Sequence, residues 1–224
     1  MKNISLKKLM LALIMGVAVP CVNAQTSQVA HIGDILCEDN QVVSPANFNA
    51  STHTPIGVVF YVDNVGKHGW AIDLQDAGSF TWGTYSYDTP LTNYTTDRLA
   101  IYDLNGYLNT QIILATFSND TTYSEDYQAF HAVDFENGWY LPAIGQLNYL
   151  YGNLIEVNSS LYMAGGVPFE TGISWRYWSS TEHGNQGAWF ISASGLLFGD
   201  GGYGDPRKPN TYRVRAARNF SIGQ

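Results

Sequence analysis

Aromatic and polar side chains that could recognise a sugar or a peptide gather late in the chain. Aromatic rings stack on the apolar face of a sugar, and arginine, amide and hydroxyl groups bind its hydroxyls. Glycine and proline place these residues in loops. The sequence therefore predicts a ligand-binding surface made of Trp175, Arg176, His183, Asn185, Gln186, Tyr203, Asp205 and Arg207. The alternative is that these loops are ordinary polar surface.

The titratable residues form no catalytic or metal-binding pattern. The five histidines are scattered, and no two have the spacing of a zinc site. No Gly-x-Ser-x-Gly turn and no phosphate-binding glycine loop is present. Asp134 and Glu136 could act as acids, but two neighbouring acids on a loop are usually solvated. We predict no enzyme activity, no metal and no cofactor, and leave open calcium binding by the 199–205 loop.

The first 24 residues have the pattern of an export signal. Lysines precede an apolar run from Leu9 to Val19, which is too short to span a bilayer. Small residues then predict cleavage after Ala24. A lipoprotein signal with an acylated Cys21 is the alternative. We therefore expect an exported protein, in the periplasm, on the outer surface or secreted, that is not inserted in the membrane.

The chain is acidic, with a basic C-terminal end. Charged residues make up only 13% of the sequence, and the formal net charge is −8. Such a charge repels nucleic acid, which is therefore not expected as a partner. We expect Arg213 and Arg215 to share one face and to pair with acids such as Glu182. A partner anion such as a sulfated glycan is the alternative. Removal of the leader leaves Cys37 alone, so no intramolecular disulfide can form.

Hydrophobic patterning predicts strands towards both ends of the mature chain and helices between them. The expected strands are a short one near residue 35, then 56–62, 70–74, 177–180, 188–193 and 212–216. The expected helices cover 103–117, 125–133 and 142–151, with a further turn of helix within 158–172. This order predicts an α+β fold. Residues 25–54 form a lead-in segment and 55–224 a single domain.

Particular side chains are expected inside the protein. Helical spacing predicts an inward face on the first helix, made of Leu104, Leu108, Ile112 and Ala115. Three tryptophans lie in apolar contexts and are expected in the core: Trp139, Trp178 and Trp189.

Several short segments resemble one bacterial family. They are 138–142 with 146–147, then 177–182, 188–189 and 212–218. In this order and spacing they resemble the C-terminal domain of the Lcl collagen-like adhesins, a widespread family of exported proteins. Residues 32–34 and 55–60 resemble the N-terminal part of gut-bacterial members.

The resemblance implies a C-type-lectin-like fold, related to that of the formylglycine-generating enzymes. Such a fold has twisted antiparallel sheets, two or three flanking helices and long irregular loops, and its terminal segments pair. The cysteine pair of those enzymes is missing here. The implied function is a non-catalytic binding protein for a glycan or a host or cell-surface ligand, with protein as the second choice. A pilus-associated or surface-assembly subunit is the alternative.

Overall fold

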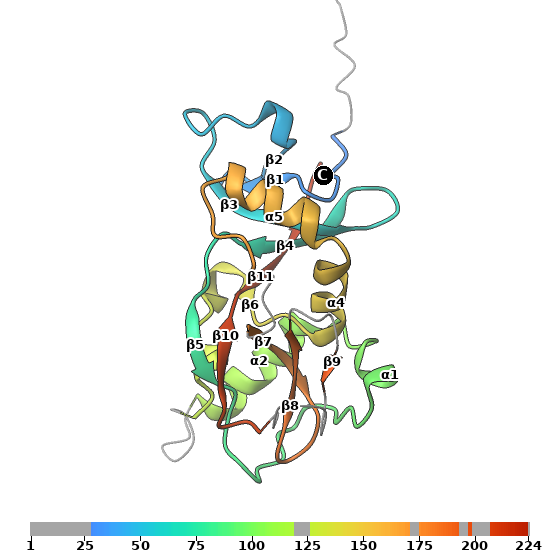
Figure 1. Ribbon diagram of the computed structural model, residues 1–224, viewed down its shortest axis with the longest axis vertical. Coiled ribbons are helices and arrows are strands. Elements are labelled where there is room, and N and C mark those ends of the chain that lie inside the picture. Colours follow the sequence, from blue (N-terminus) through green and yellow to red (C-terminus); the bar gives the residue numbers. More distant parts are fainter. Residues whose placement is uncertain (1–27, 119–125, 171–174, 193–196, 199–206, 224) are drawn as a thin grey trace, which may run out of the picture.

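Two twisted sheets form the framework of the protein (Figure 1). The computed structural model describes residues 28–118, 126–170, 175–192, 197–198 and 207–223. The upper sheet has the order β2-β1-β3-β4-β11-β6 and the lower sheet β5-β10-β7-β8-β9. The α+β class, with twisted sheets and flanking helices, is therefore confirmed. One pair, β10 with β7, is parallel, whereas we expected antiparallel pairing throughout.

The strands and helices alternate in groups along the chain. The upper sheet consists of β1 (Ile35–Cys37), β2 (Val42–Val43), β3 (Pro55–Val62), β4 (His68–Asp73), β6 (Trp139–Tyr140) and β11 (Ala217–Ser221). The lower sheet consists of β5 (Gly78–Thr81), β7 (Arg176–Glu182), β8 (Ala188–Ser192), β9 (Leu197–Phe198) and β10 (Thr211–Val214). The helices are α1 (Asp97–Ala100), α2 (Gly106–Phe117), α3 (Gln128–His131), α4 (Ile144–Gly152) and α5 (Leu154–Met163), with 3-10 turns at Pro45–Asn47 and Phe135–Asn137.

The hairpin of β3 and β4 lies at the centre of the upper sheet. The apolar run of β3 buries the residues from Gly57 to Phe60. A tight turn follows, in which the Asp63 carboxylate accepts a hydrogen bond from the Lys67 N–H at 2.9 Å. The turn also needs Gly66, whose φ of +67° is strained for other residues. This hairpin confirms the strands expected over 56–62 and 70–74.

The C-terminal segment supplies strands to both sheets. We expected one strand over 212–216, but β10 ends at Val214 and β11 begins at Ala217. Between them, the Ala216 carbonyl accepts a hydrogen bond from the Asp73 N–H at 2.9 Å. The chain therefore leaves the lower sheet and joins β4 in the upper one. The pairing of β11 with β4 is the contact between early and late strands that the lectin-like fold implies.

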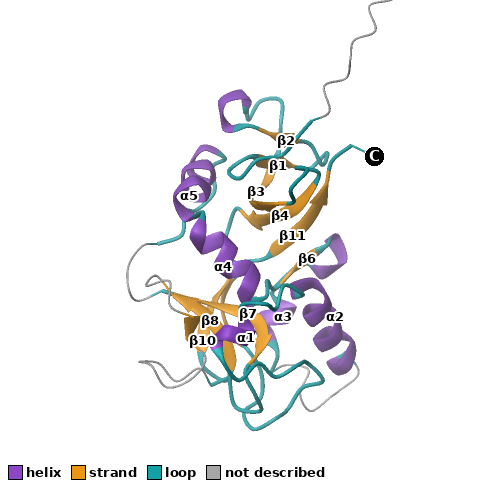
Figure 2. Cartoon of the chain, turned by 90° about the vertical axis from the view of Figure 1, so that its right-hand side faces the viewer, coloured by secondary structure: helices purple, strands orange, loops and turns teal. Residues whose placement is uncertain are grey.

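The helices cover the sheets from two sides (Figure 2). Helices α4 and α5 pack on β3, and α4 also contacts β7 and β8 of the lower sheet. Helix α2 packs on β6 and β7 from the other side. The helices expected over 103–117, 125–133 and 142–151 are present as α2, α3 and α4, which start later than expected, and α4 ends one residue later. The further turn expected within 158–172 belongs to a complete helix, α5.

The inward face of α2 differs from our expectation. Of the expected residues, Leu108 is 49% exposed and Leu104 is 38% exposed. The residues that α2 buries are instead Gly106, Thr110, Ile113 and Phe117. The Thr110 hydroxyl accepts a hydrogen bond from the Leu141 N–H at 3.1 Å. A small residue and a hydroxyl therefore make the close contact that the leucines were expected to make.

Three tryptophans anchor the core as expected. Trp139, Trp178 and Trp189 are all buried. A buried indole N–H needs an acceptor. The Trp178 indole N–H donates to the Phe80 carbonyl at 2.9 Å, and that of Trp189 donates to the Tyr94 carbonyl at 2.7 Å. The aromatic core therefore also holds β5 and the irregular segment around Tyr94.

The expected lead-in segment is part of the upper sheet. Residues 35–37 and 42–43 form β1 and β2, and β1 pairs with β3. Cys37 at the end of β1 is buried and free, and burial raises the pKa of its thiol. The expected export signal, with Cys21, lies outside the described residues.

We expect Gly69→Ala to destabilise the hairpin. A Cβ at this position would collide with the Tyr61 carbonyl oxygen and lie 2.8 Å from the Phe220 ring. Crowding of this kind typically costs about 1–3 kcal/mol of unfolding free energy. Urea unfolding followed by circular dichroism would measure the loss. The matched control is Gly184→Ala, because nothing lies within 4 Å of a Cβ there. Equal stability of the two variants would contradict the packing described here.

Candidate functional site

The polar side chains in the second half of strand β7 are engaged in contacts within the fold. All residues from Trp178 to Glu182 are buried. The Ser179 hydroxyl donates to the Trp189 carbonyl at 2.7 Å. The Thr181 hydroxyl donates to the Asp103 carboxylate at 2.7 Å and accepts from the Ile144 N–H at 2.9 Å. This segment ties β7 to β8 and to the start of α4.

Glu182 and Lys208 form a buried ion pair at the end of β7. Both side chains are fully buried. The Glu182 carboxylate also accepts from the Thr89 hydroxyl at 2.5 Å, and the Lys208 ammonium donates to the Tyr87 carbonyl at 2.5 Å. Burial raises the pKa of Glu182 and lowers the pKa of Lys208, while each charge opposes the shift of the other. Lys208 is thus the partner of Glu182, which corrects our expectation of an arginine.

The two arginines of the basic end pair with other acids. The Arg215 Nε donates to Asp76 at 2.5 Å, and an Arg213 nitrogen lies 3.6 Å from the same carboxylate. Arg213 also donates to Glu170 at 2.6 Å. The Tyr177 hydroxyl donates to Asp76 at 2.9 Å. This network joins β7, β10 and the segment after β4.

Two of the predicted ligand residues lie at the start of β7. Trp175 is only 3% exposed and packs on Phe169 and Tyr177, so our expectation of an exposed aromatic platform is wrong there. Arg176 is half-buried, with its guanidinium over the rings of Phe190 and Tyr212 at 5.5 and 5.3 Å. Both residues line a shallow hollow of about 260 Å³.

Four of the other predicted ligand residues lie at the far end of the same strand. Asn185 and Gln186 are exposed in the turn between β7 and β8, beside the half-buried His183. Arg207 is exposed, bridges to Gly187 and places its guanidinium 5.5 Å from the Tyr85 ring centre.

These two ends of β7 do not form one site. An extended strand rises about 3.3 Å per residue, so Arg176 and His183 are separated by about 20 Å. Tyr203 and Asp205, and with them the 199–205 loop considered for calcium, lie outside the described residues. A ligand role for the predicted residues stays a prediction.

Within the described ranges, no three histidine, cysteine, aspartate or glutamate side chains come together as a metal site. In the same part of the chain, no helix has the length and apolar character required to cross a bilayer.

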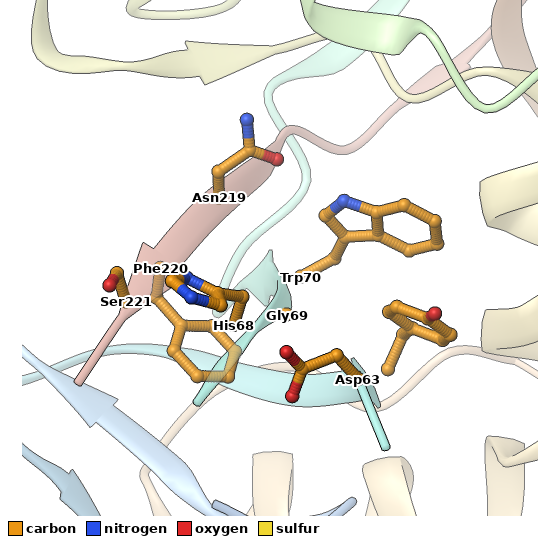
Figure 3. A pocket seen from close by; sticks show the side chains of 8 residues that line it. Asp63, His68, Gly69, Trp70, Asn219, Phe220 and Ser221 are labelled. Carbon is orange, nitrogen blue, oxygen red and sulfur yellow. The ribbon is translucent and has the colours of Figure 1, made fainter. Parts of the chain in front are cut away.

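A larger hollow, of about 460 Å³, lies over the ends of β3, β4 and β11 (Figure 3). Two rows of facing residues cross the strands here. In the first row, Trp70 lies between Tyr61 and Asn219. In the second row, His68 faces Ser221. Alternate residues of a strand share one face, so both rows point to the same side of the sheet. We call this site the upper hollow.

The upper hollow has an aromatic wall. The rings of Tyr61 and Trp70 stack with centroids 4.2 Å apart, and the ring of Tyr149 from α4 lies 4.9 Å from that of Tyr61. Trp70 is half-buried, whereas the other five of the six tryptophans are buried. Figure 3 shows the Trp70 indole and the His68 imidazole on opposite sides of the space.

Polar groups complete the upper hollow. Burial would raise the pKa of Asp63, but hydrogen bonds from the backbone N–H groups of Lys67, His68 and Val65, together with the electrostatic effect of the His68 side chain, outweigh this effect and lower it. The Asp63 carboxylate is therefore ionised at neutral pH. The Asn219 side-chain oxygen accepts from the Tyr140 hydroxyl at 2.7 Å, which fixes the orientation of its amide. Our sequence analysis missed this site because it combines the β3–β4 hairpin with β11, which lies far away in the chain.

Comparisons with known proteins find a similar fold among solved structures. No family model matches the chain, and no curated protein matches it. Among solved structures, the chain is similar to a fimbrial protein from Bacteroides ovatus, with a TM-score of 0.58 and 21% sequence identity. The match covers 85% of this chain and 48% of the fimbrial protein, so this chain corresponds to about half of that one. At this identity, the likeness establishes a shared fold.

Proposed function

We propose that this protein is an exported, non-catalytic subunit of a fimbria or a related surface assembly. The observation that carries the proposal is the fold shared with a fimbrial protein over 85% of the chain. The export pattern expected at residues 1–24 agrees with a location outside the cytoplasm. The polar side chains of β7 are engaged in hydrogen bonds within the fold, which agrees with a structural role. Ligand recognition by the loops at residues 183–186 and 207, and the Lcl resemblance, stay predictions.

Cell-surface fractionation would test the assembly role. Cells of the source organism are sheared, and the filaments are collected by ultracentrifugation and probed with an antibody against the purified protein. We expect most of the antigen in the filament fraction and immunogold label along or at the tip of filaments in electron micrographs. A strain that lacks the gene controls for the antibody. Recovery of the protein only from the soluble periplasm or the culture medium, apart from any filament, would refute the proposal.

A further inference from the structure

We propose that the upper hollow binds a neutral saccharide of one or two rings. The hollow is a different surface from both ends of β7, where the predicted ligand residues lie. Its volume of about 460 Å³ falls within the range of small-ligand sites, about 300–1,000 Å³. The inference does not depend on fimbrial assembly, because it concerns the isolated protein.

The aromatic wall is suited to the apolar face of a sugar ring. A large aromatic side chain that is left partly uncovered provides apolar contact area at little cost in conformational entropy. Trp70 is held in place by its stacked neighbour Tyr61, at 4.2 Å, and by the edge of Tyr149, at 6.0 Å. The indole is therefore oriented before a ligand arrives, and preorganisation of this kind favours affinity.

Hydrogen-bond donors and acceptors line the hollow beside that wall. The Asp63 carboxylate accepts hydrogen bonds, and Ser221 can both donate and accept. The amide nitrogen of Asn219 remains a donor, because Tyr140 occupies the oxygen. Together with His68, these residues line the same hollow (Figure 3). A hydroxyl-rich ring with an apolar face matches both the wall and its polar surroundings.

Charge selects against acidic sugars at this site. The hollow contains an ionised carboxylate and no lysine or arginine among its lining residues. The whole chain also has a formal net charge of −8. A sialylated or sulfated sugar would therefore be repelled by Asp63. Neutral hexoses and their disaccharides are the expected class.

Tryptophan fluorescence offers a direct measurement. Acrylamide quenches accessible indoles, and Trp70 is the tryptophan that is not buried. We expect one or more members of a panel of neutral disaccharides (lactose, maltose, cellobiose and mannobiose) to protect the purified protein from acrylamide, with saturation at millimolar concentration. A glycan array with the same protein extends the search to longer neutral glycans.

Variants assign the binding to the upper hollow. Trp70→Ala and His68→Ala should each weaken saccharide binding at least tenfold on the array. Asn219→Asp keeps the acceptor for Tyr140 but removes the donor, so it should weaken binding similarly. The matched control is Tyr162→Ala, an aromatic that is 79% exposed on α5, and it should bind normally.

Each possible result of these experiments either supports or overturns the proposal. If Trp70→Ala does not fold, as judged by circular dichroism, His68→Ala and Asn219→Asp decide the question. Binding that is lost in these variants and kept in Tyr162→Ala supports the proposal. No protection and no array signal with any neutral saccharide overturns it, as does binding that these variants leave unchanged or binding restricted to acidic glycans. None of these results bears on whether the protein is found in filaments.

Discussion

Replacing Lys208 with methionine should lower the free energy of unfolding by about 3–5 kcal/mol, because it leaves a carboxylate buried without its counter-charge. Glu182 and Lys208 are both fully buried. In Lys208→Met, Glu182 keeps its hydrogen bonds from Thr89 but loses the ammonium that compensates its desolvation. Guanidinium unfolding at pH 7, followed by circular dichroism, would measure the change.

Two further variants test the cause of that loss. Arg98→Met removes an exposed positive charge and should change stability by no more than about 0.5 kcal/mol. The double variant Glu182→Gln with Lys208→Met removes both charges and should recover part of the loss. A Lys208→Met protein as stable as the Arg98→Met control would show that the pair is not buried as described.

Trp178→Ala should destabilise the protein by about 3–5 kcal/mol, through the cavity it leaves in the lower half of the core. Trp178 is fully buried, with its ring 4.3 Å from that of Tyr212 and 6.1 Å from that of Phe190. Its indole N–H also donates to the Phe80 carbonyl. Thermal and urea unfolding would measure the loss.

Three further substitutions serve as comparisons for Trp178→Ala. Trp178→Phe refills much of the cavity and should cost less than Trp178→Ala. Tyr162→Ala removes a ring that is 79% exposed and should leave stability almost unchanged. Trp175→Ala should also destabilise the protein, since Trp175 is buried. A loss below about 1 kcal/mol in Trp178→Ala would contradict the core described here.

Local patterns predicted the framework because they have a direct physical origin. The run of apolar, β-branched and aromatic residues over 56–62 favours a strand, and β3 follows it closely. Tryptophans in apolar surroundings are core residues, as Trp139, Trp178 and Trp189 show. These segments are buried mainly because of their own hydrophobicity, and that hydrophobicity can be read directly from the sequence.

Other features depend on partners distant in the sequence. The buried face of α2 rests on Gly106 and Thr110 because Leu141, about thirty residues further on, approaches closely there. Trp175 looked like a loop residue, but Phe169 and Tyr177 bury it. The upper hollow combines Tyr61 with Trp70 and Asn219, and no local pattern joins residues on β3 and β4 to one on β11. These three residues lie side by side because of the register in which β3, β4 and β11 pair.

The shared C-terminal segment has a consequence for how the protein comes apart. Residues 211–221 hydrogen-bond with β5 and β7 in one sheet and with β4 and β6 in the other. One sheet cannot unfold and free its strand of this segment without pulling on the strand in the other sheet. Between the two strands, Arg215 is also bound to Asp76. The two sheets are therefore mechanically coupled, and the molecule should melt as one cooperative unit rather than in two stages.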